Sequence, residues 1–120
     1  MAKSKADLFP PEEIALAGFA KCLAHPARVA IVTFLRENRE ASCGQIVEAL
    51  PLAQPTVSQH LKALLSGGLL LARESGPMIF YSLNQARIQN FCTIFRDSIS
   101  GPASALAPEA APAASQLVAS

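Results

Sequence analysis

The sequence predicts a mainly α-helical domain with one small β-hairpin, and three observations lead to this fold class. Apolar residues recur at helical spacing in five segments, most of which are bounded by Pro or Gly. Two of these segments are separated by only a few residues, which is typical of a helix-turn-helix. Two short apolar runs, "LLLARE" and "MIFYSL", flank the turn sequence "SGP" and precede the last helical segment.

The first two helices are predicted from their proline starts. Pro11 is followed by two acidic residues, which favour the positive end of a helix dipole, and apolar residues then recur to about Leu23. A second helix begins at Pro26 with "PARVAIVTFLREN" and carries a single apolar stripe. His25 precedes this helix and is interpreted as a helix-start residue.

The third and fourth helices form the predicted helix-turn-helix. Ser42 opens "SCGQIVEAL" with an S-x-x-Q capping box, and Pro51 ends this helix. After the short break "PLAQ", Pro55 opens the fourth helix, which stops at the glycine pair 67–68.

The hairpin and a fifth helix complete the order. Strands are predicted at 69–74 and 78–83, followed by the helix "NQARIQNFCTIFRDSI" at 84–99. Helices, a helix-turn-helix and a hairpin in this order predict a winged helix over residues 11–100. Residues 1–10 are expected to be flexible. The segment 101–120 holds eight Ala and three Pro, so we expect a disordered tail that does not dock on the domain.

Composition narrows the class of protein. A chain of 120 residues with 51% hydrophobic residues is the size of one domain with its own core. Its net charge of +1 gives no overall signal for nucleic acid or membrane, so any such signal must be local. The sequence shows neither a signal peptide nor an apolar run of about 20 residues, and its three cysteines lack a CxxC pair. We therefore expect a cytoplasmic protein without a membrane segment.

The polar face of the fourth helix is the candidate site. At 100° per residue, Val57, Leu61, Leu64 and Leu65 point inward, whereas polar side chains point outward. The outward side chains are short and rich in donors and acceptors, which suits the base edges of a major groove. The predicted DNA-binding residues are Gln54, Thr56, Ser58, Gln59, His60, Lys62 and Arg73. Among them Thr56, Ser58 and Gln59 are predicted to read bases.

A solvated helix face explains the same pattern about equally well, and the hairpin favours DNA. Arg73 and the turn at Ser75 and Gly76 are placed to reach the neighbouring backbone as a wing. Residues 54–83 carry Lys62 and Arg73 against Glu74, a net charge of +1, so one copy would bind weakly. A functional DNA reader is therefore expected to be a dimer. His60, at the flank of the helix, has two interpretations, a support for the turn or a phosphate contact.

Three stretches carry a resemblance to a known family. "CLAHPARVAIV", "GQIVEALPLAQPTVSQHLKALLSGGLL" and "RESGPMIFYSL" resemble the ArsR/SmtB family of winged-helix repressors over roughly residues 14–98. The resemblance implies a homodimer packed through the first and fifth helices, binding to a double-stranded operator, and release by an inducer. The family's inducer sites do not carry over, because Ser42 and Gly44 stand where metal-sensing members have a Cys-x-Cys, and the fifth helix contains no His. No metal site and no cofactor are predicted, and the inducer stays unidentified.

The cysteines are the remaining candidates for sensing. Cys43 shares an apolar stripe with Ile46 and Val47, so we interpret it as a core residue. Cys22 lies off the main stripe of its helix, and the family's packing of first against fifth helix implies that it could approach Cys92. We expect Cys22 to be the most accessible thiol and Cys92 its partner, with packing roles as the alternative for both.

Two other functions are weighed against DNA binding. The two His are far apart in sequence, and neither paired acids at helical spacing nor a glycine-rich phosphate loop is present, so an enzyme is not expected. The weak local charge leaves a winged helix that binds another protein, without operator DNA, as the alternative.

Overall fold

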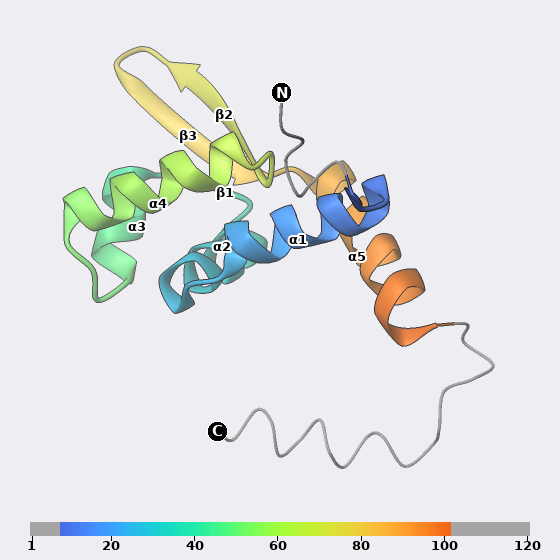
Figure 1. Ribbon diagram of the computed structural model, residues 1–120. Helices are drawn as coiled ribbons and strands as arrows, with labels where there is room; N and C mark the ends of the chain where they lie inside the picture. Colours follow the sequence, from blue (N-terminus) through green and yellow to red (C-terminus); the bar gives the residue numbers. More distant parts are fainter. Residues whose placement is uncertain (1–7, 102–120) are drawn as a thin grey trace, which may run out of the picture.

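The computed structural model describes residues 8–101, and the predictions for residues 1–7 and for the tail from residue 102 lie outside this part. The five predicted helices and the hairpin follow one another in the predicted order, with one additional short strand before the third helix (Figure 1). The elements are α1 Pro11–Leu23, α2 Pro26–Asn38, β1 Glu40–Ser42, α3 Cys43–Ala49, α4 Gln54–Ser66, β2 Leu70–Ser75, β3 Met78–Leu83 and α5 Gln85–Phe95. A π-helical turn, Arg96–Ser100, continues α5.

The helix starts confirm the capping signals of the sequence. His25 is the N-cap of α2, where its Nδ1 accepts a hydrogen bond from the backbone N–H of Ala27 at 3.0 Å. At α3 the Ser42 Oγ accepts from the Gln45 N–H at 3.2 Å, and the Gln45 Oε1 accepts from the Ser42 N–H at 2.9 Å. This reciprocal pair is the predicted capping box. The fourth helix begins at Gln54, one residue before the predicted start.

The sheet has one strand that the sequence did not predict. β1 precedes α3 and pairs antiparallel with β3, so the strand order is β1-β3-β2. The hairpin itself is as predicted, with Ser75 opposite Met78 and Gly76 at φ 60° in its turn. β1 has only three residues, too few to show an alternating pattern. It fixes the base of the hairpin to the start of the helix-turn-helix.

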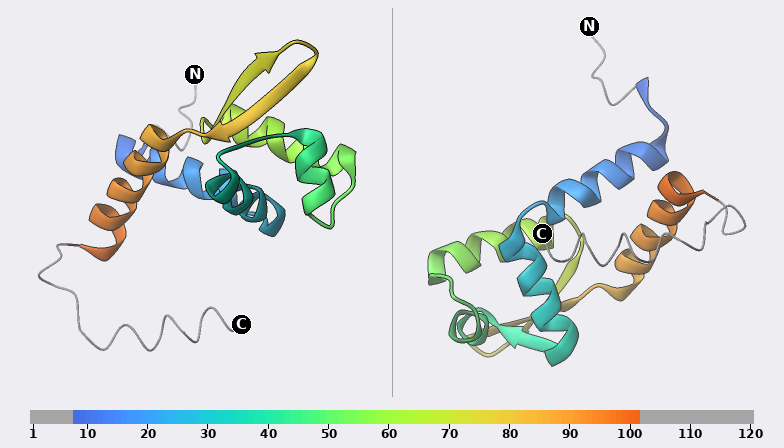
Figure 2. Two further views of the ribbon diagram at one scale, coloured as in Figure 1. Left: turned by 180° about the vertical axis from the view of Figure 1, so that it is seen from behind. Right: turned by 90° about the horizontal axis from the view of Figure 1, so that it is seen from below.

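The core lies between α1, α2, α3, α4 and the start of β2. Its most completely buried side chains are Ile31, Leu35, Ile46, Val57, Leu61, Leu64 and Leu69. The β2–β3 hairpin projects beyond these helices in Figure 1 and in the left view of Figure 2, and α5 leaves the body on the side away from α3. The molecule thus presents the hairpin and α4 at one end and α5 at the other.

The fifth helix is only partly covered by its own chain. Phe91 stacks on Phe19 of α1 with ring centroids 4.7 Å apart, yet no residue of α5 is buried. Phe95 and Ile99 are 48% and 63% exposed. The apolar stripe read from the sequence is present, and most of it faces away from the core.

No single helix among residues 8–101 is long and apolar enough to cross a membrane. Only α1 and α2 taken together reach that length and hydropathy, and the chain bends by 90° between them.

A close contact at the end of α4 gives a first testable prediction. A Cβ added to Gly67 would lie 2.5 Å from the Sγ of Cys22 and 3.2 Å from its Cβ. We expect Gly67→Ala to lower the free energy of unfolding by about 1–3 kcal/mol, the usual cost of overpacking. Urea unfolding followed by circular dichroism measures the loss.

Two variants control this prediction. Gly44→Ala adds a Cβ whose nearest neighbour is the Ser42 Oγ at 3.8 Å, so it should be neutral or slightly stabilising. Cys22→Ala in the Gly67→Ala background removes the opposing sulfur and should restore part of the loss. A Gly67→Ala protein as stable as Gly44→Ala would show that α1 and the end of α4 are not in contact.

Candidate nucleic-acid interface

The helix-turn-helix consists of α3, a short connection and α4. The two helices lie side by side in all views (Figures 1 and 2). Ala53 accepts the first backbone hydrogen bond of α4, from the Val57 N–H at 3.0 Å, and Pro55 occupies the first turn. Val57 and Leu61 are buried, which fixes how α4 is rotated about its axis. The outward face of α4 is therefore set by the core beneath it.

The polar residues of α4 lie largely where the sequence placed them. Gln54, Ser58, Gln59 and Lys62 are exposed, and Thr56 is half-buried at the edge of the face. Within residues 8–101 the side chains of Ser58, Gln59 and Lys62 form no hydrogen bond, so their donors and acceptors are free. Such a surface offers hydroxyl, amide and ammonium groups to a ligand with a dense pattern of polar atoms.

The side chain of Gln54, unlike those of Ser58, Gln59 and Lys62, has a partner within the described residues. Its Nε2 lies 3.9 Å from the Sγ of Cys43, a weak contact between the start of α4 and the start of α3. The amide still has an exposed carbonyl oxygen and a second N–H. Gln54 therefore remains at the edge of the interface.

His60 differs from the other predicted DNA-binding residues, because it lies inside the fold. It is 9% exposed, and its Nδ1 accepts a hydrogen bond from the Arg28 Nε at 3.1 Å. Arg28 also donates to the Cys22 carbonyl oxygen at 3.0 Å, and the ring of His25 lies 4.6 Å from that of His60. The structure places His60 as a support that ties α4 to α1 and α2, away from a phosphate contact.

The surroundings of His60 favour the neutral imidazole. Burial, and then the charges of His25 and Arg28, lower the pKa of His60 below its ordinary value of 6.5. The hydrogen bond from Arg28 also requires an unprotonated Nδ1. Folding therefore disfavours the protonation of His60.

This shift predicts a loss of stability in mild acid. A lowered pKa means that the unfolded chain binds a proton more readily, so the contribution of His60 is complete above about pH 6.5 and falls as the pH drops below that value. We expect Tm to decrease between about pH 7.5 and 5.5, above the range in which ordinary carboxylates titrate. Thermal unfolding in buffers of equal ionic strength measures this slope.

Two histidine variants show which histidine causes the decrease of Tm in mild acid. His60→Gln should flatten it, whereas His25→Asn, which keeps an N-cap acceptor for α2, should retain most of it because burial is the main cause. An unchanged slope in His60→Gln would assign the acid sensitivity to other groups.

Arg73 lies on the hairpin, engaged with a residue that the sequence reading missed. Its Nε and second terminal nitrogen donate to the two carboxylate oxygens of Glu40 at 3.2 and 2.7 Å, and its guanidinium lies 5.0 Å from the ring centre of Phe80. These hydrogen bonds lower the pKa of the Glu40 carboxyl. A phosphate would have to compete with Glu40 for Arg73. Only the pairing of β1 with β3 brings Glu40 here, so the sequence alone gave no signal for it.

The cysteines are arranged opposite to the expectation. Cys22, predicted to be the most accessible, is buried beside the Ala63 carbonyl oxygen, and burial raises the pKa of its thiol. Cys92 is exposed and Cys43 is half-buried. Cys22 lies off the stripe of α1 because it packs against the end of α4. Cys92, as the most exposed of the three, is the first candidate for a thiol response, whereas the buried Cys22 with its raised pKa would react slowly.

In the described part of the chain, no three His, Cys, Asp or Glu side chains come together in a way that could hold a metal ion. The His25–His60 pair has an arginine as its third member and no carboxylate.

Comparison with known proteins shows which proteins this chain resembles. A family model described as a helix-turn-helix domain matches residues 23–72. The HTH-type transcriptional repressor SmtB of Mycobacterium tuberculosis is 42% identical over 76 residues, which are 62% of this chain and 56% of SmtB. The transcriptional repressor PagR of Bacillus anthracis is 38% identical over 69 residues, 58% of this chain and 69% of PagR. The chain thus spans a little over half the length of SmtB.

A solved structure shows the same fold. An ArsR-like transcriptional regulator from Rhodococcus sp. RHA1 superposes with a TM-score of 0.64 at 25% identity, covering 70% of this chain and 78% of that one. The residues matched by the family model, 23–72, include the helix-turn-helix, whose outward face is the candidate interface described above.

Proposed function

Because the chain belongs to the ArsR/SmtB family of helix-turn-helix transcriptional regulators, we propose that it is a DNA-binding transcriptional repressor that binds an inverted-repeat operator as a homodimer. The observation that carries this proposal is the exposed polar face of α4, on which the side chains of Ser58, Gln59 and Lys62 have no hydrogen-bond partner within the described residues.

The α4 helix is the recognition helix in this proposal. Gln59 has the carboxamide that pairs with the N6 and N7 edge of adenine, and the hydroxyls of Thr56 and Ser58 suit either type of base pair. Lys62 is the one charged residue on this face and is assigned to a phosphate. Gln54, at the start of the helix, is placed to contact the edge of the site.

The hairpin acts as the wing in this proposal. It projects on the same side as α4 (Figure 1), and Arg73 supplies its cation when the phosphate displaces Glu40. Both side chains of the Arg73–Glu40 pair are exposed, and water and salt weaken an exposed ion pair, so the phosphate can replace Glu40 at little cost.

The proposed dimer uses α1 and α5. Ile14, Phe95 and Ile99 are exposed apolar side chains on these two elements and on the turn that continues α5. A second copy would cover them and would place two α4 helices in successive turns of the groove. Release by a thiol-reactive inducer stays a prediction, and Cys92, on the same helix, is the thiol through which it would start.

Selection from random duplexes followed by affinity measurements at several salt concentrations tests this function. A repressor should enrich one sequence, and its affinity for that duplex should fall steeply as salt rises, because each neutralised phosphate releases counterions. The alternative, a winged helix that binds another protein, would enrich no sequence.

A further inference from the structure

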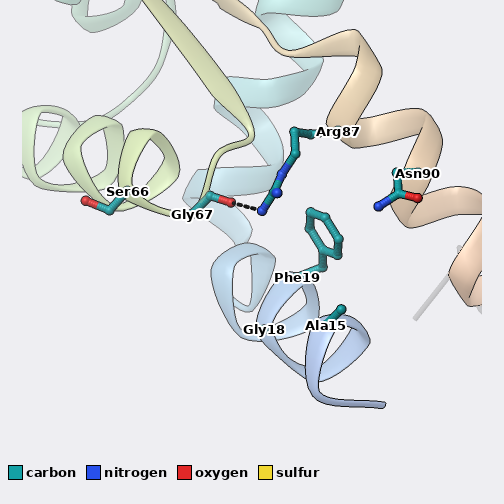
Figure 3. Close-up of a pocket in the computed structure, with 7 residues that line it drawn as sticks. All are labelled: Ala15, Gly18, Phe19, Ser66, Gly67, Arg87 and Asn90. Carbon is teal, nitrogen blue, oxygen red and sulfur yellow. Dashed lines mark hydrogen bonds between the residues drawn. The ribbon is translucent and has the colours of Figure 1, made fainter. Parts of the chain in front are cut away.

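A pocket of about 290 Å³ lies between α1, the end of the recognition helix α4, and α5. It is lined by Ala15, Gly18, Phe19, Ser66, Gly67, Arg87 and Asn90. Arg87 and Asn90 are three residues apart on α5 and face the same space above the ring of Phe19, as Figure 3 shows. Three elements that are distant in sequence therefore converge on one guanidinium and one carboxamide.

Arg87 is held in place without an acidic partner. Its guanidinium lies 5.2 Å from the ring centre of Phe19, and a terminal N–H donates to the Gly67 carbonyl oxygen at 3.4 Å (Figure 3). Arg36, Arg73 and Arg96 each have a carboxylate within ion-pair distance, whereas Arg87 has none among residues 8–101. Its remaining N–H groups are unused in that part of the chain.

These groups define the chemistry of a ligand. A guanidinium with free, forked donors is the protein group best matched to a carboxylate, and the carboxamide of Asn90 offers one further donor. Ala15 and Gly18 have little or no side chain, which leaves space beside the ring of Phe19 for an apolar body. The volume is near the lower limit for small-molecule sites, so the body must be compact.

We propose that this pocket binds a small organic monocarboxylate, with Arg87 as the anion-binding residue, and that the ligand controls DNA release. The second half of this proposal rests on the proposed function. Gly67 caps the end of α4, and Arg87 is the α5 side chain that bonds to it. A bidentate carboxylate takes Nη2, the nitrogen that bonds to Gly67, together with one of the unused nitrogens of Arg87, so binding loosens the link between the recognition helix and the proposed dimer helix.

The binding half is tested on the protein without DNA. Acetate, butyrate and benzoate are titrated in turn, with acetamide, butyramide and benzamide as uncharged analogues, and the backbone amides of Gly67, Arg87 and Asn90 are followed by NMR. At least one acid should give saturable shifts, and its amide should not. Arg87→Gln should weaken that acid by about tenfold or more, the value of one charge-assisted hydrogen bond.

Matched variants decide the outcome of this titration. Arg36→Gln removes another exposed arginine, distant from the pocket, and should bind the acid like the unchanged protein. Arg87→Lys keeps the positive charge but lacks the planar pair of N–H donors. Its affinity for the acid should therefore lie between those of the unchanged protein and Arg87→Gln. The site is refuted if no acid shifts these amides, if amides bind as well as acids, or if Arg87→Gln changes the oligomeric state and leaves acid binding intact.

The second part of the proposal, control of DNA release, is tested with the operator obtained by selection from random duplexes. The acid that binds should weaken the operator complex by about 5-fold or more in the unchanged protein. It should have no effect on the complex formed by Arg87→Gln. Binding of the acid without any change in operator affinity would overturn the control of release while leaving the site. A protein that selects no DNA would overturn the proposed function, and the NMR titration would still decide the pocket.

Discussion

Phe95→Glu is expected to yield a folded monomer whose affinity for the operator is lower by about 100-fold or more, the gain that a second binding event ordinarily supplies. Phe95 is 48% exposed on α5, and its ring centroid lies 6.3 Å from that of Phe91. A charge there leaves the fold intact and places an unpaired carboxylate in the proposed dimer face. Sedimentation velocity and titration of a labelled operator measure the two effects.

Val29→Glu is the matched control for Phe95→Glu. Val29 is 49% exposed on α2, away from the proposed dimer face, so this variant adds the same charge at an equally exposed apolar position. It should remain a dimer and keep its operator affinity within about threefold, the range of ordinary surface substitutions. If Phe95→Glu is also dimeric and binds like Val29→Glu, the two copies do not meet through α5.

Gln59→Ala is expected to weaken binding to the operator by about 1–3 kcal/mol while affecting random DNA little. Its carboxamide is exposed on α4 and has no hydrogen-bond partner among the described residues, so the substitution removes only what Gln59 gives to a ligand. Competition titrations against operator and random duplexes give both affinities. Gln85→Ala, an exposed glutamine at the start of α5, should change neither.

Two outcomes would contradict the role of Gln59 in reading bases. Equal weakening of operator and random DNA would make Gln59 a backbone contact, and no weakening at all would place another face of the domain in the groove.

The sequence predicted the helices well because their ends carry local chemistry. Pro11, Pro26 and Pro55 lie in the first turns of their helices, and Ser42 caps α3 as expected. These signals act within a few residues, so no knowledge of the tertiary fold is needed to read them.

The parts that the sequence did not reveal depend on contacts between distant segments. A helical wheel places His60 at the flank of α4, but only the packing of α2 shows that Arg28 and His25 cover that flank. Cys22 was misjudged for the same reason, because Gly67 lies 45 positions further along the chain.

The sequence predicted which residues of α4 form the candidate site, but it did not predict how Arg73 is paired. The outward face of α4 follows from the period of its apolar residues, and Gln59 and Lys62 are exposed as the wheel implied. The pairing of Arg73 with Glu40 needed the register of β1 against β3. The pocket at Arg87 likewise needed α1, α4 and α5 in place.

Hydroxyl-radical footprinting of the protein on its selected operator, with the stoichiometry of the complex, tests the central claim most directly. A homodimer that reads DNA through two α4 helices should protect two inverted half-sites whose centres lie about 10 bp, or a multiple of that, apart, with two chains per duplex. A single unrepeated half-site bound by one chain would contradict it.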